Sequence, residues 1–461
     1  MVLFIVKKIK NSRQTLTFIF GAMTILQLYD YFIESHQNIT TDSRKITPNC
    51  LFFALRGETF NGNVFAQKAI EMQACWVIMD DSNYFIDDKT CILVDNVLET
   101  LQQLANYHRN QLKNTTIFIG ITGSNGKTTS KELLKCVLST KFATQATIGN
   151  LNNHIGVPLT LLSVYAHHQF AVIEMGANHP DEVLELCQIV EPDVALVTSI
   201  GKEHLEGFGS MEQIIKAETD IYRFVAERKG LIFVNADDAI LMHETQHIKN
   251  KMLYGVDKNA DTVGRLVASS LFVHFRWDTT YRLMLHAPTV ETQLIGVYNF
   301  CNLMSAASIG RYFSVPYDKI NEALSSYLPS NKRSEYLEKG SNRLIIDCYN
   351  ANPSSMHAAI HNFAHHIVAD YKVLIVGDMF ELGHYAGQEH RAMIDDIEGL
   401  GFDEVYCIGA NFMGQSIESE RIRFFESVAD LKKYKPLSDF EHSFVLIKGS
   451  RGMALEDYLL D

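Results

Sequence analysis

Short apolar runs alternate with segments of helical spacing along most of the chain, and this alternation predicts an α/β protein. Near the N-terminus, LYDYFIES (28–35) has the spacing of a helix, whereas CLFFAL (50–55) and CWVIMD (75–80) are typical of strands. A further apolar run, TCILVD (90–95), closes this group. We therefore predict a small α/β domain over residues 23–95.

The next section of the chain has the pattern of a larger sheet. The helical segment 97–112 leads into the β-rich run TTIFIGIT (115–122), which a glycine turn and a helical segment follow. Further buried-strand candidates are FAVIEMGA (170–177), VALVTSI (194–200) and GLIFVNA (230–236), with helical stretches between them. This order predicts a mostly parallel sheet with helices on both faces.

Two other patterns complete the central section. LFVHFRW (271–277) and YRLMLHA (281–287) alternate apolar and polar positions, so residues 261–295 are expected to be rich in strands. A helical segment, 300–313, then leads to a predicted boundary near Pro329.

The last third alternates again. RLIIDCY (343–349), KVLIVGDM (372–379), EVYCIGA (404–410) and SFVLIKGS (443–450) are strand candidates separated by helix-like sequence. They predict a second, Rossmann-like doubly wound sheet.

Length supports a division into domains, because 461 residues are too many for one compact core. The predicted fold class is α/β with three domains: a small N-terminal α/β domain, a central phosphate-loop-type mostly parallel sheet and a C-terminal doubly wound sheet. We predict four segments, namely an extension over 1–22 and domains over 23–95, 96–329 and 330–461.

Residues 1–22 do not have the pattern of a secretory signal. Two apolar runs flank a basic patch, and neither approaches the roughly 20 residues needed to span a bilayer. We expect a loosely ordered extension, with a weak membrane-surface anchor as the alternative.

Net charge and cysteine content indicate which ligands and which cell compartment to expect. The formal net charge of −13 argues against nucleic acid and against insertion into an anionic membrane, yet a local basic loop can still bind phosphate. The eight cysteines stand singly without a CxxC pair, which indicates free thiols in a reducing, cytoplasmic compartment. We expect small-molecule substrates and a monomer.

A glycine-rich loop between a predicted strand and a predicted helix is the main chemical feature. Its glycines let backbone amides approach phosphate oxygens, and the helix N-terminus favours negative charge. Ile121 replaces the first glycine of the GxxxxGK[ST] pattern, but the second half is intact. The predicted ATP-binding loop consists of Gly123, Ser124, Asn125, Gly126, Lys127, Thr128 and Thr129.

Two polar residues follow predicted strands of the same sheet. Glu174 ends FAVIE, and His204 comes soon after VALVTSI. In a parallel sheet both emerge at the edge that carries the loop, where with Thr128 they suit a Mg²⁺ ion. Lys216 lies farther on, and the pattern around it favours a solvated helix lysine.

With these residues assembled, the chain resembles the Mur ligase family from Met23 to its end. TGSNGKTT (122–129) is similar to the family's ATP loop, and GNLNNHIGVP (149–158) resembles the stretch that handles the UDP-muramoyl substrate. The resemblance implies Mg²⁺ at Glu174 and His204, and a functional role for Lys216, which matches a lysine that is carbamylated in several members of the family. It gives catalytic roles to Lys127, His204 and Lys216.

The resemblance extends the nucleotide site to three more positions. Asn299 matches an adenine contact, Arg333 an arginine near the phosphates, and Asp347 a ribose contact. Lys332 stands where the family more often has glycine. Without the resemblance, all three would be interpreted as polar residues at helix starts or domain boundaries.

The outer domains indicate which reaction the resemblance implies. DCYNANPSS (347–355), GDMFELG (377–383) and KGSRG (448–452) are similar to motifs of the family member that adds D-alanyl-D-alanine. TDSR (41–44) resembles a uridine-nucleotide site, although Asn63 replaces a more common histidine nearby. The implied amino-substrate residues are Asn350, Asn352 and Ser355, and the implied UDP-substrate residues are Asp42, Ser43, Arg44, Asn150, Asn152 and Asn153.

The function implied is ATP- and Mg²⁺-dependent amide ligation of D-alanyl-D-alanine to a UDP-muramoyl tripeptide in peptidoglycan synthesis. Alternatives are the ligase that adds the third residue, a folylpolyglutamate synthase relative and a nucleotide-binding regulator without catalysis. The Asp-Asn-Pro-Arg stretch of the third-residue enzyme is absent. A GTPase lacks support because no NKxD-type stretch follows the loop.

Overall fold

The structure is a computed structural model that describes residues 23–269, 271–329 and 333–460. The predicted extension over residues 1–22, with its membrane-anchor alternative, and Lys332 lie outside the described residues. The chain divides into two compact units: Met1–Lys113 with Leu161–Ser163, and Asn114–Thr160 with Val164–Asp461. The predicted boundaries of three domains stay a prediction.

The first unit holds a four-stranded parallel sheet in the order β1-β2-β3-β4. Its strands are β1 (Ile39–Thr40), β2 (Leu51–Phe53), β3 (Trp76–Met79) and β4 (Cys91–Leu93). Its helices are α1 (Ile25–Glu34), η1 (Gly62–Phe65), α2 (Ala66–Glu71), η2 (Ser82–Tyr84) and α3 (Val97–Leu112).

The long helix α3 belongs to this first unit. Asn96 caps its N-terminus by accepting from the backbone N–H groups of Leu98 and Glu99. Its buried face reaches α1, where Tyr29 and His108 share a hydrogen bond of 3.2 Å between the hydroxyl and Nδ1.

The second unit begins with a nine-stranded sheet in the order β13-β12-β11-β10-β9-β8-β5-β7-β6. Strands β5 to β11 are parallel, and β12 and β13 extend the sheet as an antiparallel edge. The strands are β5 (Ile117–Thr122), β6 (Thr144–Ala146), β7 (Phe170–Glu174), β8 (Val194–Val197), β9 (Leu231–Asn235), β10 (Lys251–Gly255), β11 (Thr262–Ser269), β12 (Phe272–Asp278) and β13 (Val290–Ile295). The predicted mostly parallel sheet is confirmed.

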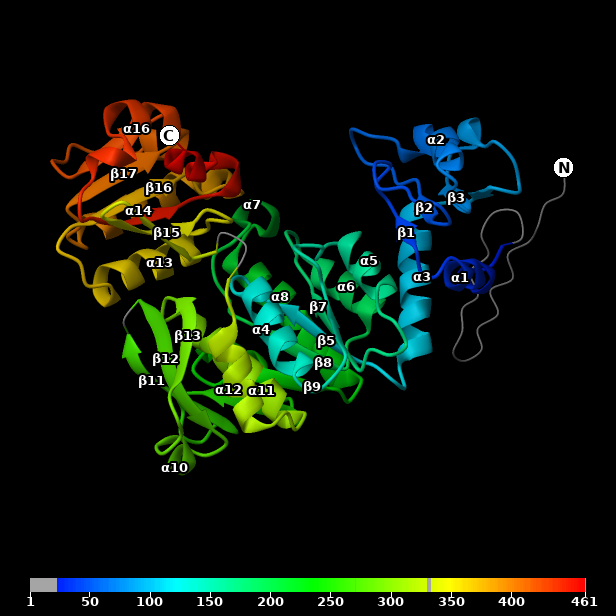
Figure 1. Ribbon diagram of the computed structural model, residues 1–461, viewed down its shortest axis with the longest axis horizontal. Helices are drawn as coiled ribbons and strands as arrows, with labels where there is room; N and C mark the ends of the chain where they lie inside the picture. Colours follow the sequence, from blue (N-terminus) through cyan, green and yellow to red (C-terminus); the bar gives the residue numbers. More distant parts are fainter. Residues whose placement is uncertain (1–22, 270, 330–332, 461) are drawn as a thin grey trace. The chain divides into compact units, whose positions relative to one another are not determined.

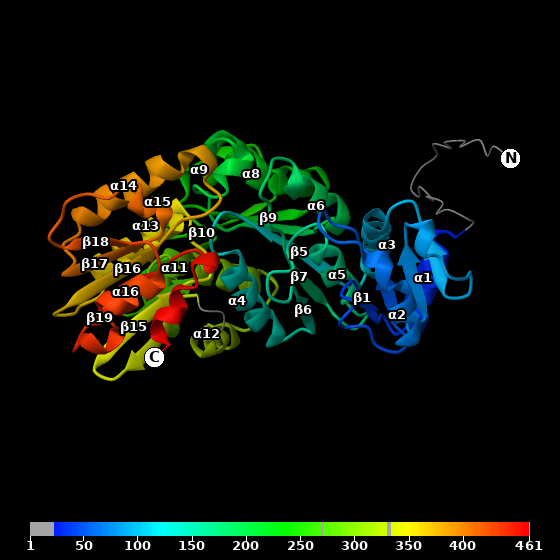
Figure 2. The same ribbon diagram turned by 90° about the horizontal axis from the view of Figure 1, so that it is seen from above.

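Helices cover both faces of this sheet (Figures 1 and 2), with α4 and α12 on one side and α6 and α8 on the other. The helices are α4 (Lys127–Ser139), α5 (Gly156–Leu162), α6 (Glu182–Val190), α7 (Leu205–Phe208), α8 (Met211–Glu227), α9 (Ala239–Glu244), α10 (Tyr281–Met284), α11 (Asn299–Tyr312) and α12 (Tyr317–Ser326). Strands β5, β7, β8 and β9 are fully buried apart from Ile117, which explains their continuous apolar runs.

One predicted strand is wrong. YRLMLHA (281–287) alternates like a strand, but residues 281–284 form α10. Thr280 is the cause, because its hydroxyl caps the first turn by accepting from the N–H of Leu283 at 3.4 Å.

The last sheet has six strands in the order β14-β15-β19-β16-β17-β18, all parallel except β14. The strands are β14 (Glu335–Lys339), β15 (Asn342–Asp347), β16 (Lys372–Gly377), β17 (Glu404–Ile408), β18 (Ile422–Phe425) and β19 (Phe444–Lys448). The helices are α13 (Pro353–His366), η3 (Gly383–Tyr385), α14 (Ala386–Glu398), α15 (Ala410–Met413), α16 (Val428–Tyr434), η4 (Leu437–Asp439), η5 (Arg451–Met453) and η6 (Leu455–Leu459). The predicted doubly wound sheet is confirmed.

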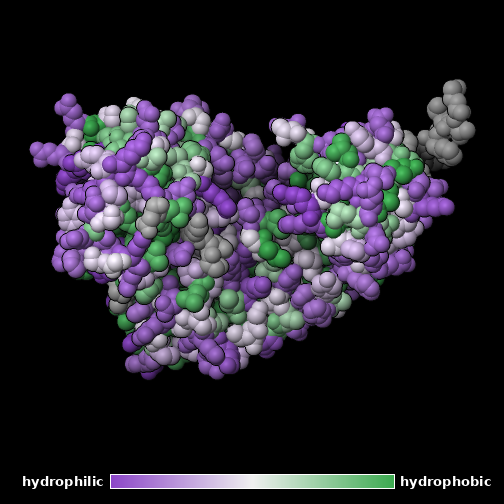
Figure 3. Space-filling model, turned by 45° about the horizontal axis from the view of Figure 1, so that its top comes forward, coloured by the Kyte–Doolittle hydropathy of each residue, from purple (hydrophilic) through white to green (hydrophobic). Residues whose placement is uncertain are grey.

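The helices of the described residues were compared with the length and apolar character that a membrane span needs. None of their helices is long and apolar enough to cross a bilayer. Hydrophilic residues cover much of the face in Figure 3, with apolar residues scattered among them.

Candidate nucleotide site at the β5–α4 loop

The loop between β5 and α4 has the backbone of a phosphate-binding turn. Gly123 and Gly126 adopt φ angles of 122° and 85°, which disfavour residues with a side chain. A Cβ on Gly123 would lie 2.4 Å from Thr198 Oγ1, and one on Gly126 would lie 2.5 Å from Asn302 Oδ1. Both glycines are therefore required, and the loop leads directly into the N-terminus of α4.

A buried carboxylate fixes the start of this loop. Glu218 on α8 is fully buried, and its Oε2 accepts from Thr122 Oγ1 at 2.5 Å and from the N–H of Gly123 at 2.6 Å. Sequence reasoning missed Glu218, although it falls between the buried Ile214 and Ile221 on the apolar face of α8. A carboxylate on the apolar face of a helix could have indicated a buried functional residue.

The rest of the loop is tied to the end of β8. Ser124 Oγ accepts from the N–H of Gly201 at 2.8 Å, and Thr198 Oγ1 donates to the carbonyl of Asn125 at 2.6 Å. Thr129 is half-buried in the first turn of α4. These bonds preorganise the loop rather than leaving it to form around a ligand.

The half-buried Lys127 lies beside the buried carboxyl group of Glu203. Lys127 Nζ donates to the carbonyl of Gly123 and lies 3.6 Å from Glu203 Oε2. Burial alone would lower the pKa of Lys127, but the carboxylates of Glu203, Glu218 and Glu174 outweigh it and raise that pKa. Burial raises the pKa of Glu203 to about 8 despite the nearby Lys127 ammonium. Sequence reasoning missed Glu203.

Glu174 and Thr128 come together at the end of β7. Thr128 Oγ1 donates to Glu174 Oε1 at 3.0 Å, and Asn152 Nδ2 donates to the same oxygen at 2.9 Å. Glu174 Oε2 is buried without a hydrogen-bond partner, and Lys131 Nζ lies 3.5 Å from it. A carboxylate oxygen left without a hydrogen bond beside a hydroxyl fits a Mg²⁺ ion, which prefers oxygen ligands.

His204 follows β8 at the start of α7, and its metal and catalytic roles stay a prediction. It has a left-handed φ of 43° at the start of α7, and its Nε2 lies 3.7 Å from Glu203 Oε2. Its Nδ1 contacts the carboxylate of Glu381 from the C-terminal sheet. Among the contacts of the described residues, His204 therefore belongs with Glu203 and Glu381, whereas Thr128 belongs with Glu174.

Lys216 lies apart from these contacts. Its side chain on α8 is 55% exposed, and its Nζ is 3.5 Å from Asp181 Oδ1. This is the environment of a solvated helix lysine, and the catalytic role of Lys216 stays a prediction.

The other predicted nucleotide residues make contacts within the protein. Asn299 is the first residue of α11, and its Oδ1 accepts from Asn302 Nδ2 in the same helix at 2.9 Å. The Arg333 guanidinium lies 4.0 Å from the centre of the Tyr349 ring, and its Nε is buried without a hydrogen-bond partner. Asp347 Oδ2 accepts from the buried Lys448 at 2.8 Å.

The predicted amino-substrate residues lie at the start of α13. Asn352 and Ser355 form its capping box, and Asn350 Oδ1 accepts from the N–H of Ala351 at 2.9 Å. Asn352 Nδ2 also donates to Asn125 Oδ1 of the loop at 3.1 Å. One helix start thus contacts the nucleotide loop.

The predicted UDP-substrate residues fall into two groups. In the first unit, Asp42 and Arg44 form an exposed pair with Ser43 in the turn between them, and hydrogen bonds from Arg44 lower the pKa of Asp42. In the second unit, Asn150 and Asn153 are exposed, and Asn153 Oδ1 accepts from the N–H of Gly156 at 2.9 Å.

Asn63 takes a structural place in the first unit. Its side chain is buried and donates through Nδ2 to Asp80 Oδ1 at 2.9 Å, and Asp80, in turn, accepts from Arg56 Nε at 2.7 Å. The asparagine that replaces the more common histidine therefore anchors the loop that follows Arg56.

A glycine loop between a strand and a helix, beside a buried carboxylate and hydroxyl at the carboxyl edge of a parallel sheet, defines a nucleotide-binding α/β protein. Family models agree with this class. Residues 121–310 match the Mur ligase middle domain, residues 332–451 the Mur ligase glutamate ligase domain, and residues 36–109 the catalytic domain of the Mur ligase family. The chain belongs to the Mur ligase family.

Individual relatives cover nearly the whole chain. It is 32% identical to the UDP-N-acetylmuramoyl-tripeptide--D-alanyl-D-alanine ligase of Bacillus subtilis over 92% of each chain. The enzyme of the same name from Escherichia coli is also 32% identical, over 91% of this chain and 92% of that one.

Solved structures give the same result. MurF from Acinetobacter baumannii has a TM-score of 0.81 and 29% identity over 92% of each chain. MurF ligase from Thermotoga maritima in complex with ADP has a TM-score of 0.80 and 25% identity, covering 92% of this chain and 96% of that one.

Proposed function

We propose that the protein joins D-alanyl-D-alanine to the terminal carboxylate of UDP-N-acetylmuramoyl-tripeptide at the expense of ATP, in peptidoglycan synthesis. The observation that carries this proposal is the 32% identity, over 92% of both chains, to a ligase of that name. The preformed loop and the Thr128–Glu174 pair support it independently.

In this proposal the loop amides and Lys127 hold the ATP phosphates. The substrate carboxylate attacks the γ-phosphorus, which gives an acyl phosphate and ADP. Lys127 neutralises charge on the transferring phosphoryl group, and the protein acts mainly by positioning. Thr128 and Glu174 would hold Mg²⁺, which supplies further neutralisation of phosphate charge.

The second half-reaction uses the C-terminal sheet. The amine of D-alanyl-D-alanine attacks the acyl carbon and phosphate leaves, so that one amide bond forms for each ATP consumed. We assign Asn350, Asn352 and Ser355 to the amino substrate because α13 begins beside the loop, where Asn352 contacts Asn125. Asp42, Ser43, Arg44, Asn150, Asn152 and Asn153 are assigned to the UDP-linked substrate, and Asn299, Arg333 and Asp347 to the nucleotide.

The proposed substrates and residues bear on the cell compartment and on the number of subunits. A reaction that consumes ATP and a nucleotide-linked precursor is expected in the cytoplasm. All the groups assigned above come from one chain, so the proposal requires no partner subunit.

The test is phosphate release from ATP and Mg²⁺ with UDP-N-acetylmuramoyl-tripeptide, with and without D-alanyl-D-alanine. We expect release that requires both substrates, together with a pentapeptide product by mass. Release only with the dipeptide precursor and a diamino acid would transfer the assignment to the ligase of the preceding step. Nucleotide binding without release in either mixture would reject a ligase function.

A further inference from the structure

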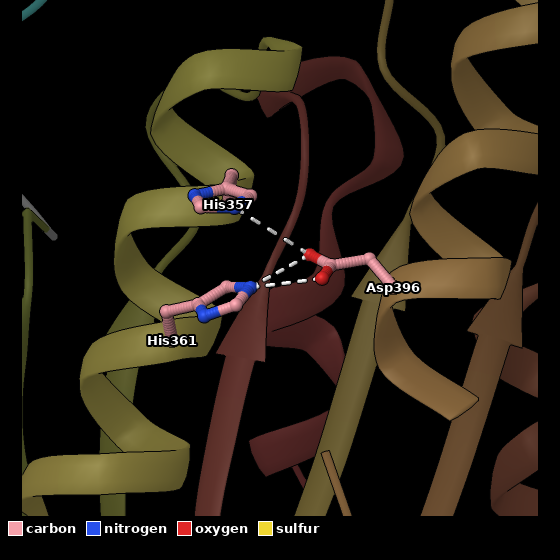
Figure 4. Close-up of side chains that lie close together, drawn as sticks. All are labelled: His357, His361 and Asp396. Carbon is pink, nitrogen blue, oxygen red and sulfur yellow. Dashed lines mark hydrogen bonds and ion pairs between the residues drawn. The ribbon is translucent and has the colours of Figure 1, made fainter. Parts of the chain in front are cut away.

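A cluster of two histidines and an aspartate lies on the helices of the C-terminal sheet, and the proposed reaction does not use it. His357 and His361 are on α13, and Asp396 is on α14 (Figure 4). One ligand atom from each residue lies within 4.8 Å of the others. Their side chains are 60%, 29% and 28% exposed, so solvent ions reach them.

The helix geometry places both imidazoles against one carboxylate. Residues four apart lie on the same face of a helix, and the two rings stack with centroids 3.9 Å apart at 20°. His361 Nε2 is 2.9 Å from both oxygens of Asp396, and His357 Nε2 is 3.9 Å from Oδ2.

A hydrogen-bonded ion pair accounts for His361 and Asp396, but it leaves His357 without a hydrogen bond to the carboxylate. The 3.9 Å contact of His357 is within ion-pair range but too long for a hydrogen bond. Tetrahedral ligands at zinc bond lengths stand about 3.3 Å apart, a value between the two observed separations. Small rotations of exposed side chains would therefore bring all three atoms to one ion.

We propose that His357, His361 and Asp396 bind a divalent transition metal ion of the zinc type, with water completing its coordination. Two imidazole nitrogens and a carboxylate oxygen suit Zn²⁺ and its neighbours, whereas Mg²⁺ prefers oxygen ligands alone. The bound ion clips α13 to α14. Because α13 begins at the Asn352–Ser355 capping box, the bound ion would hold in place the helix that carries the proposed amino-substrate residues.

The main experiment is a calorimetric titration of the full-length, tag-free protein with ZnCl₂. We expect one saturable site whose affinity falls about tenfold or more in His361→Gln and in Asp396→Asn. The matched control is His243→Gln, which removes an exposed histidine that also pairs with a carboxylate, at 3.2 Å, and leaves the site intact. Equal zinc affinity in the wild type and both site variants overturns the proposal.

A second measurement uses the unaltered protein and does not depend on the variants folding. Co²⁺ bound by nitrogen and oxygen gives visible d–d absorption without the near-ultraviolet charge-transfer band of a thiolate. We expect that spectrum, its removal by ZnCl₂ and its persistence in excess MgCl₂. A thiolate band would assign the ion to one of the eight free cysteines, and the absence of any Co²⁺ spectrum would leave only a histidine–aspartate ion pair. Either result overturns the proposal.

Discussion

At the scale of single residues, the candidate site depends on four ionisable groups around one loop. Lys127 has carboxylates from Glu203, Glu218 and Glu174 close enough to raise its pKa. These acidic groups hold the Lys127 ammonium in place before the phosphates arrive. Removing one member therefore changes the others, because the charges are coupled.

Lys127→Ala removes the only one of these four groups that carries positive charge. We expect turnover to fall by at least about a hundredfold, since charge on the transferring phosphoryl group is no longer neutralised. Phosphate release under saturating substrates measures this. Lys135→Ala, an exposed position on the same helix, is the control, and near-wild-type turnover in Lys127→Ala would remove Lys127 from the mechanism.

The ionisation of Glu203 is expected to make nucleotide affinity depend on pH. Its pKa of about 8 means that the carboxyl is neutral below that pH and anionic above it. Above pH 8 the carboxylate pairs more strongly with Lys127 and repels phosphate, so ATP affinity should fall as pH rises through 8. Calorimetric titration with ADP between pH 7 and 9 measures the effect.

Glu203→Gln cannot ionise and is the variant that isolates this effect. We expect its nucleotide affinity to lack the decrease near pH 8 that the wild type shows. The same decrease in both proteins would assign the titration to another group.

At the scale of elements, helix α8 holds the loop that β5 and α4 form. Residues from three segments meet there, because Glu218 accepts from Thr122 and Gly123 while Ser124 and Asn125 bond to the end of β8. The spacing of apolar residues predicts α8 itself. It does not predict which loop its buried carboxylate reaches.

Glu218→Ala tests this support. The buried hydroxyl of Thr122 and the N–H of Gly123 lose their acceptor, which costs about 1–3 kcal/mol each when no replacement is found. We expect a lower thermal unfolding midpoint and weaker ADP binding. Glu227→Ala, exposed on the same helix, should change neither, and unchanged ADP binding in Glu218→Ala would show that the loop keeps its shape without this carboxylate.

At the scale of the second unit, contacts join the central sheet's loops to the C-terminal sheet. Lys202 Nζ lies 2.6 Å from Glu389 Oε1 on α14, and Ser354 Oγ accepts from the N–H of Lys202 at 2.7 Å. Together with the contact of His204 with Glu381, these two contacts hold loops of the C-terminal sheet beside the nucleotide loop. Exclusion of water from an acyl phosphate is the advantage of such contacts.

Lys202→Met is expected to uncouple the reaction. Glu389, whose side chain is 7% exposed, loses its partner, so the two parts are held together less firmly. The ratio of phosphate released to amide formed should rise above one. Lys319→Met, which breaks an exposed pair with Glu322 inside α12, is the control. A ratio of one in Lys202→Met would show that these contacts do not protect the intermediate.

The sequence by itself determined most of the buried strands, because buried parallel strands leave continuous apolar runs, and it determined the loop, because Gly123 and Gly126 are tied to backbone angles. It did not reveal β1, β6, β10, β14 or β18, most of whose positions are half-exposed or exposed.

Tertiary structure alone decided which charges meet. Glu203 and Glu218 act on Lys127 from positions 76 and 91 residues farther along the chain, and no local period encodes those separations. It also placed His204 against Glu381, and it brought Asp396 to His357 and His361. Burial and long-range contact set the pKa values of Lys127 and Glu203 and the partner of each group, and both exist only once the sheets have folded.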